Sequence, residues 1–228
     1  MTLYLIALLL TGCATEAAFI VFEQKERMLT ALLLKAAASL FFVLAGFVAF
    51  AQTSIPAYGR MIALGLMLSA IGDVCLNLRF LMTGRARTIF LLGIGTFLLG
   101  HIASLIALIG LDPKALLLAL PVAAIVSYGM IRFVLARVEV SGATKTFGIV
   151  YLCVVFLLAC VSLALFALDP QSPGRAVFAV GALLFAASDV LLVLNQFGKQ
   201  TYRALRPLHL SLYYLGQVCL CLTIALMR

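Results

Sequence analysis

Residues 63–78 read ALGLMLSAIGDVCLNL, and residues 179–194 read AVGALLFAASDVLLVL. Aligned without gaps at an offset of 116, the two stretches share eight identities in sixteen positions, among them Asp73 with Asp189. Each stretch is apolar and makes up most of a segment long enough to cross a bilayer. Because a carboxylate is costly in lipid, both stretches indicate helices that turn an acid toward the interior of a membrane protein.

The composition of the whole chain agrees with this interpretation. Of 228 residues, 65% are hydrophobic and 11% are charged, and the mean hydropathy is +1.23. These values exclude a soluble globular protein and a disordered one, since neither can cover so much apolar surface. Eight apolar stretches of about 20 residues each predict membrane-spanning helices. They are residues 3–22, 29–51, 59–79, 88–109, 115–137, 144–168, 175–196 and 207–227.

The repeat extends beyond the opening pair of stretches. The same offset places Leu99-Gly100-His101 over Leu215-Gly216-Gln217. Four helices separate the copies, and because four is even, both copies cross the membrane in the same sense. We therefore predict an all-α membrane protein whose eight transmembrane helices form two parallel four-helix repeats around a pseudo-two-fold axis along the membrane normal. Residues 1–228 form one transmembrane domain, with repeat halves of approximately 1–112 and 113–228; chance similarity between apolar helices is the alternative.

The net charge of +8 is explained by membrane orientation. Lys and Arg gather in the odd-numbered connections, which predicts that these connections face the cytoplasm and that both termini lie on the other side. The odd connections hold Lys25, Arg27, Arg79, Arg85, Arg87, Arg132, Arg137, Lys145, Lys199, Arg203 and Arg206, against Arg60, Lys114, Arg175 and Arg228 elsewhere. Charges spread over short loops do not form a nucleic-acid surface. We expect a multi-pass protein of the bacterial inner membrane.

Ionisable residues inside the predicted spans indicate a buried polar layer. Counted from the end expected in the cytoplasm, Glu16, Lys35, Asp73 and Asp189 each lie about six or seven residues in, or ~10 Å. His101 and Gln217 lie roughly 5–10 Å deeper by the same measure. Ser69, Asn77 and Ser188 are further polar residues on the helices of the aspartates, and Tyr128, Tyr151 and Tyr214 fall near the same level on other helices.

Each member of this layer also has a structural interpretation. Lys35 could extend to the interface, and Glu16 could be its ion-pair partner without any chemical role. The tyrosines could belong to an interfacial belt, and His101 could be a packing residue. Asp73 and Asp189 are the hardest to explain structurally, since they occupy matching places in the repeat.

Two carboxylates facing a common axis suggest proton chemistry. Like charges in a poorly solvated site cannot both ionise easily, so the pair would hold one proton near neutrality. Such a pair suits general acid-base hydrolysis, and it equally suits a proton-coupled transporter of a small or amphiphilic solute. With only two histidines and no HxxxH or HExxH spacing, the sequence predicts no metal site. No GxSxG motif indicates a serine nucleophile.

A set of motifs resembles the YhhN-like lysoplasmalogenase family. Taken in order they combine Gly72-Asp73, Gly100-His101, a G-A-L-L-F-x-x-S-D stretch at 181–189 and Y-Y-x-x-Q at 213–217, with Asn195-Gln196-Phe197 between the last two. The resemblance covers most of the chain from Lys35 to the C-terminus. Its specificity lies in the order and spacing of the motifs, since any one alone is weak.

This resemblance implies an integral-membrane hydrolase that cleaves the vinyl ether bond of lysoplasmalogens without a cofactor. The products are a fatty aldehyde and glycerophosphocholine or glycerophosphoethanolamine. One of Asp73 and Asp189 would be the acid and the other the base. Supporting or substrate-binding roles fall to Lys35, His101, Ser188, Tyr214, Gln217, Asn77, Asn195 and Glu16, and Arg79, Arg85, Arg203 or Arg206 would meet the phosphate of the lysophospholipid. A transporter, or a structural protein that tolerates loss of either aspartate, is the alternative.

Overall fold

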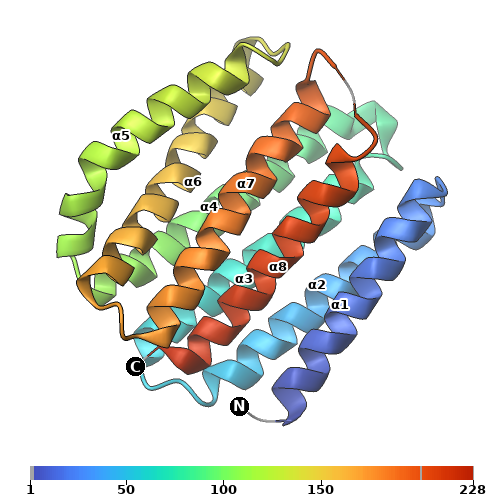
Figure 1. The fold of residues 1–228 in the computed structure, drawn as a ribbon. Coiled ribbons are helices and arrows are strands. Elements are labelled where there is room, and N and C mark those ends of the chain that lie inside the picture. The colour runs from blue at the N-terminus through green and yellow to red at the C-terminus, as the bar shows by residue number, and fades with distance from the viewer. Residues whose placement is uncertain (1–2, 201, 228) are drawn as a thin grey trace.

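The protein is a bundle of eight long helices joined by short connections (Figure 1). The structure is a computed structural model that describes residues 3–200 and 202–227. Every helix is long and apolar enough to span a membrane, which confirms the predicted fold class. The helices are α1 (Leu3–Gln24), α2 (Met28–Phe50), α3 (Pro56–Leu78), α4 (Ala86–Leu111), α5 (Lys114–Leu135), α6 (Gly142–Leu168), α7 (Pro173–Phe197) and α8 (Leu205–Leu226), with a 3₁₀ turn η1 (Thr83–Arg85) before α4.

The observed helix bounds differ from the predicted ones by a few residues. The largest shifts include the starts of α3 and α7, which begin at Pro56 and Pro173 instead of residues 59 and 175. Proline is favoured at the first position of a helix, where its missing N–H is not needed for an intrahelical bond. Arg79, predicted at the end of the third span, lies one residue beyond α3.

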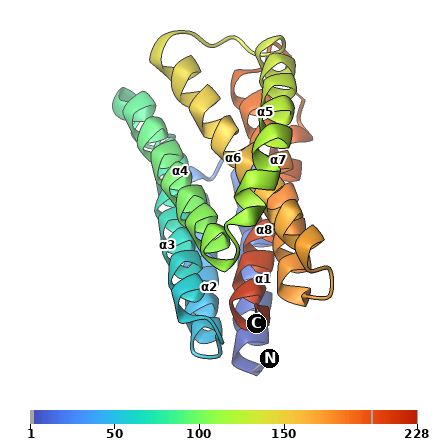
Figure 2. The same cartoon turned by 90° about the vertical axis from the view of Figure 1, so that its left-hand side faces the viewer.

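The two ends of the bundle differ in character. Both termini lie at one end, together with the α2–α3, α4–α5 and α6–α7 connections (Figures 1 and 2). The other end carries the α1–α2, α3–α4, α5–α6 and α7–α8 connections, where the sequence concentrates Lys and Arg; we call it the basic end. The helix bounds thus keep the charge asymmetry that the sequence predicts, and the side of the membrane that each end faces stays a prediction.

Glycines set the closest helix crossings. A Cβ added to Gly65 of α3 would lie 3.2 Å from the Gly100 oxygen of α4, and one added to Gly100 would lie 3.2 Å from the Gly65 oxygen. In α7 and α8, a Cβ on Gly181 would lie 2.8 Å from the Cys219 Cβ, and one on Gly216 would meet the Phe185 ring at 3.0 Å. Small residues let membrane helices approach closely. The two glycine pairs are related by the predicted offset of 116, although the two-fold arrangement itself stays a prediction.

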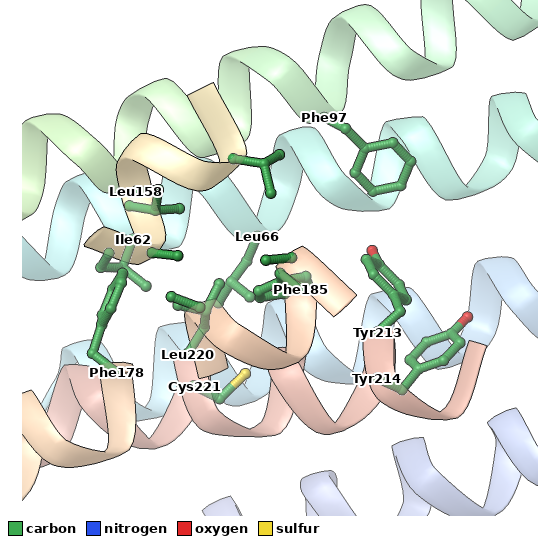
Figure 3. Packing of buried hydrophobic residues seen from close by; sticks show 14 of the residues in the cluster. Ile62, Leu66, Phe97, Leu158, Phe178, Phe185, Tyr213, Tyr214, Leu220 and Cys221 are labelled. Carbon is green, nitrogen blue, oxygen red and sulfur yellow. The ribbon is translucent and has the colours of Figure 1, made fainter. Parts of the chain in front are cut away.

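The apolar core lies where α3, α4 and α6 face α7 and α8. In Figure 3, Phe97 of α4 points toward Tyr213 of α8, and Phe185 of α7 lies between the same groups of helices. Tyr58 of α3 is buried and donates a hydrogen bond to the Thr223 hydroxyl of α8 (2.8 Å). In contrast, α5 turns large apolar side chains such as Leu117 and Ile125 outward. An apolar exposed face on a membrane-spanning helix is the surface expected to contact lipid.

Two sets of hydrogen bonds join elements at the basic end. Val138 of the α5–α6 connection forms an isolated antiparallel bridge with Gly198, at the end of α7. The Arg79 guanidinium, after α3, donates to the Gln196 side-chain oxygen of α7 (2.8 Å). The hydrogen bond between Arg79 and Gln196 links the ends of the two helices that carry the aspartates. It therefore relates the depth of Asp73 in the bundle to that of Asp189.

Candidate active site

Asp73 lies in α3, buried, within a cluster of donors from two other helices, α2 and α8. Its carboxylate accepts hydrogen bonds from Ser39 of α2 (2.6 Å) and Tyr213 of α8 (2.9 Å) at Oδ2, and the Lys35 ammonium lies 3.2 Å from Oδ1. Gln217, one helical turn after Tyr213, donates to the Tyr213 hydroxyl at 2.6 Å. This arrangement stabilises a negative charge on Asp73, since a buried carboxylate needs both a cation and hydrogen-bond donors.

Asp189 lies in α7, also buried, and has a different set of partners. The His101 Nε2 atom of α4 lies 3.5 Å from Asp189 Oδ2 and 3.2 Å from the Tyr151 hydroxyl of α6. Tyr151 also lies close enough to Asp189 to interact with it. Asp189 therefore faces an imidazole and a phenol, whereas Asp73 faces an ammonium group.

Aromatic rings connect the two clusters. The Tyr213 ring packs edge-on against Phe97 and Phe185, with centroids 5.6 Å apart in each pair, and Phe185 packs edge-on against His101 at 5.7 Å. Tyr213 and Phe185 are among the side chains drawn in Figure 3. Within the described part of the chain, no hydrogen bond joins the two carboxylates directly, and these rings connect their surroundings instead.

The depths of the two carboxylates agree. Asp73 precedes Arg79 by six residues, about 9 Å along the helix, and Asp189 precedes Gln196 by seven, about 10 Å. Because Arg79 and Gln196 are hydrogen-bonded, both aspartates lie at nearly one level below the basic end. The sequence predicted such a layer, and the bond between Arg79 and Gln196 supplies its register.

The structure brings some of the predicted supporting residues to these clusters. Lys35, 3% exposed, is buried against Asp73 and does not extend to the interface. His101 contacts Asp189. Gln217 donates a hydrogen bond to the Tyr213 hydroxyl, which in turn donates to Asp73.

Other predicted residues lie beside the clusters. The Ser188 hydroxyl donates to the His209 carbonyl oxygen (2.8 Å) and so joins α7 to α8. Tyr214 is buried with its ring against Phe42 and Tyr213. Asn77 is buried one turn beyond Asp73, Asn195 is half-buried near the end of α7, and Glu16 is buried in α1. Tyr128 faces outward with 65% of its surface exposed, as an interfacial residue would.

Three members of the clusters were not predicted as site residues, and each had a signal. Ser39 follows Lys35 by one turn and so shares its helix face. Tyr213 precedes Gln217 by four residues, whereas the predicted Tyr214 points along another face. The repeat offset places Lys35 directly over Tyr151, which makes Tyr151 the counterpart of the residue that pairs with Asp73.

Fold and site together define a multi-pass membrane protein with two buried carboxylates in unlike polar clusters. Comparison with known families places the chain among such proteins: it matches the YhhN family model over residues 26–224. The chain therefore belongs to the YhhN family, the family of lysoplasmalogenases. The matched residues include both aspartates, all of α2 to α7 and most of α8. In the same comparisons, no curated protein and no solved structure matched the chain.

Proposed function

We propose that the protein is a lysoplasmalogenase that hydrolyses the vinyl ether bond of a lysophospholipid by general acid-base catalysis with Asp189 and Asp73. One observation carries this proposal beyond family membership: two buried carboxylates lie at one level, and Asp73 faces the Lys35 ammonium group whereas Asp189 faces the His101 imidazole. Unlike surroundings assign unlike roles to a pair of carboxylates.

Asp189 is the general acid in this proposal. We assign it this role because its neighbours are an imidazole and a phenol, whereas Asp73 is paired with an ammonium group. Asp189 transfers its proton to the β-carbon of the vinyl ether, which leaves an oxocarbenium ion beside the new carboxylate. His101 and Tyr151 hold the Asp189 side chain in place. The developing positive charge is stabilised by the carboxylate, as in glycoside hydrolysis.

Asp73 is the general base. Water adds to the oxocarbenium carbon and gives a proton to Asp73, by way of the Tyr213 hydroxyl that already donates to it. The resulting hemiacetal collapses: its hydroxyl proton returns to Asp189, the bond to the glycerol oxygen breaks, and that oxygen takes the proton from Asp73. The sum consumes one water and yields an aldehyde and a glycerophosphodiester, with both aspartates restored.

Aldehyde release from the purified protein tests the proposal. Wild type in detergent with lysoplasmalogen should release fatty aldehyde, followed with a coupled aldehyde dehydrogenase. Asp189→Asn should lower kcat by about 10²- to 10⁴-fold, the usual contribution of a general acid or base, and Asp73→Asn should lower it within the same range. Asp169→Asn, a partly exposed carboxylate of the α6–α7 connection, is the matched control and should retain wild-type turnover.

The outcomes separate three possibilities. Aldehyde release that survives either aspartate substitution would remove this mechanism and leave the enzyme assignment. Absence of release from wild type, combined with a pH-gradient-dependent uptake of the intact lysolipid into vesicles, would instead identify a proton-coupled transporter. Loss in both aspartate variants, with wild-type release, supports the mechanism.

A further inference from the structure

A polar pocket opens at the basic end, directly above Asp73 and Asp189 along their helices. Its volume is about 470 Å³, and it lies where the end of α3 and the start of α4 meet α6 and α7. Its lining residues are Arg79, Phe80, Thr83, Ala86, Arg87, Phe90, Thr144, Gln196 and Phe197. Two arginines, two threonines and an amide thus surround a space with aromatic walls.

Arg79 contributes a buried positive charge to this pocket that lacks a carboxylate partner. It is 6% exposed, and its Nε atom has no hydrogen-bond partner among the described residues. Its remaining contacts are with the Gln196 amide and the faces of Phe80 and Phe90. Glu23, an acidic group whose charge acts on Arg79, forms a two-pronged ion pair with Arg206.

Arg79 has no carboxylate in contact to balance its charge. Burial lowers the pKa of Arg79 to about 10, the positive charge of Arg206 acts in the same direction, and the negative charge of Glu23 opposes both. A buried charge without a partner is costly, and the Arg fork matches the oxygens of a phosphate group. An anion bound in the pocket would supply the partner that Arg79 lacks.

A second space, which we call the slot, adjoins this pocket. Its volume is about 40 Å³, it shares Phe90, Thr144, Gln196 and Phe197 with the pocket, and it is also lined by Tyr151. The Tyr151 hydroxyl is hydrogen-bonded to His101, which contacts Asp189. The slot is otherwise lined by apolar side chains of α4, α6 and α7. The slot therefore adjoins both the pocket at the bundle end and Tyr151, a member of the Asp189 cluster.

The length of this path matches the substrate proposed above. Seven bonds separate the phosphorus atom of a lysoplasmalogen from the β-carbon of its vinyl ether, or about 9 Å at the advance per bond of an extended chain. Gln196 lies about 10 Å above Asp189 and Arg79 about 9 Å above Asp73, both from the helical rise. A phosphate held at Arg79 would thus bring the β-carbon to the level of the carboxylates.

We propose that the pocket lined by Arg79, Arg87 and Gln196 binds the phosphate of the lysophospholipid headgroup and sets the position of the vinyl ether at Asp189. The glycerol extends from the pocket toward Tyr151, between α4, α6 and α7, and the alkenyl chain continues into the apolar interior. This inference rests on the proposed function for its substrate, but it makes a separate claim about where the phosphate is held.

Paired substrates test the headgroup pocket. Arg79→Gln should lower kcat/KM for lysoplasmalogen by about 10- to 100-fold, the range for losing a hydrogen bond to a charged group. With a 1-alkenylglycerol that lacks the phosphate, Arg79→Gln and wild type should have equal kcat/KM, because neither protein can then form the contact between Arg79 and a phosphate. Arg87→Gln should behave similarly, and because the Arg87 side chain is exposed, this variant tests the contact without disturbing the packing of the bundle. Arg137→Gln, an exposed arginine elsewhere at the basic end, should match wild type on both substrates.

Binding without turnover gives a second measurement. A saturated alkyl lysophosphocholine, which has no vinyl ether, should raise the unfolding temperature of wild type and not that of Arg79→Gln. Inorganic phosphate is the competing ligand: stabilisation by millimolar phosphate that depends on Arg79, without stabilisation by the lysolipid, would mean a site for free phosphate and overturn the proposal. Equal loss on both substrates in Arg79→Gln would also overturn it. If wild type releases no aldehyde, the proposed function fails. The binding measurement still tests whether the pocket at Arg79 binds the headgroup phosphate.

Discussion

At the scale of single residues, the site depends on how each buried charge is neutralised. Lys35 and Asp73 form an ion pair in which the side chains are 4% and 3% exposed. Ser39 and Tyr213 complete the hydrogen bonding of the carboxylate. Removing one partner of a buried pair leaves the other charge uncompensated, whereas replacing both with less polar groups costs much less.

This asymmetry gives a stability prediction for the Asp73 cluster. Lys35→Met alone should lower the free energy of unfolding by about 3–5 kcal/mol, because the Asp73 carboxylate loses its cation. The double variant Lys35→Met/Asp73→Asn should recover most of that loss, as the buried charge is gone. Thermal unfolding in detergent measures both. A double variant less stable than Lys35→Met alone would show that Asp73 is stabilised by other groups than Lys35.

At the scale of helices, the fold depends on glycines that let two pairs of helices approach closely. A Cβ at Gly181 of α7 would lie 2.8 Å from the Cys219 Cβ of α8, whereas one at Gly129 of the outward-facing α5 would meet no atom within 4 Å. Alanine at the first site must push the helices apart. Alanine at the second site only favours the helical backbone.

The two glycine substitutions should therefore act in opposite directions. Gly181→Ala should reduce the free energy of unfolding by about 1–3 kcal/mol through overpacking, and Gly129→Ala should raise it by up to about 1 kcal/mol. Unfolding temperatures in one detergent give the comparison. Equal effects of the two substitutions would mean that the α7–α8 crossing adjusts freely to an added methyl group.

At the scale of the whole molecule, the charge distribution predicts how the bundle lies in the membrane. The basic end gathers most of the Lys and Arg residues of the connections, and the bias of these residues toward the cytoplasm sets orientation. Both termini lie at the opposite end (Figure 1). A headgroup pocket at the basic end would then receive lysophospholipid from the cytoplasmic leaflet.

Reporter fusions at the C-terminus measure this orientation. Alkaline phosphatase, which folds only outside the cytoplasm, should be active there, and green fluorescent protein should be dark. Moving the fusion to the α3–α4 connection should reverse both signals. A fluorescent C-terminal fusion would overturn the predicted orientation and would leave the fold unaffected, since the packing of the bundle does not depend on which side it faces.

The sequence alone determined the class of fold, because eight apolar segments of bilayer length can be satisfied in lipid only as helices. It also identified Asp73, Asp189 and Lys35 as residues needing a polar interior, since a charge in a membrane span carries a large cost. Periodicity along one helix, however, does not say which face meets which neighbour. For that reason the sequence did not single out Tyr213, which donates to Asp73, and did not predict that Ser188 donates to the His209 carbonyl oxygen. Those pairings, and the pocket at Arg79, depend on how separate helices cross, and only the tertiary structure decides that.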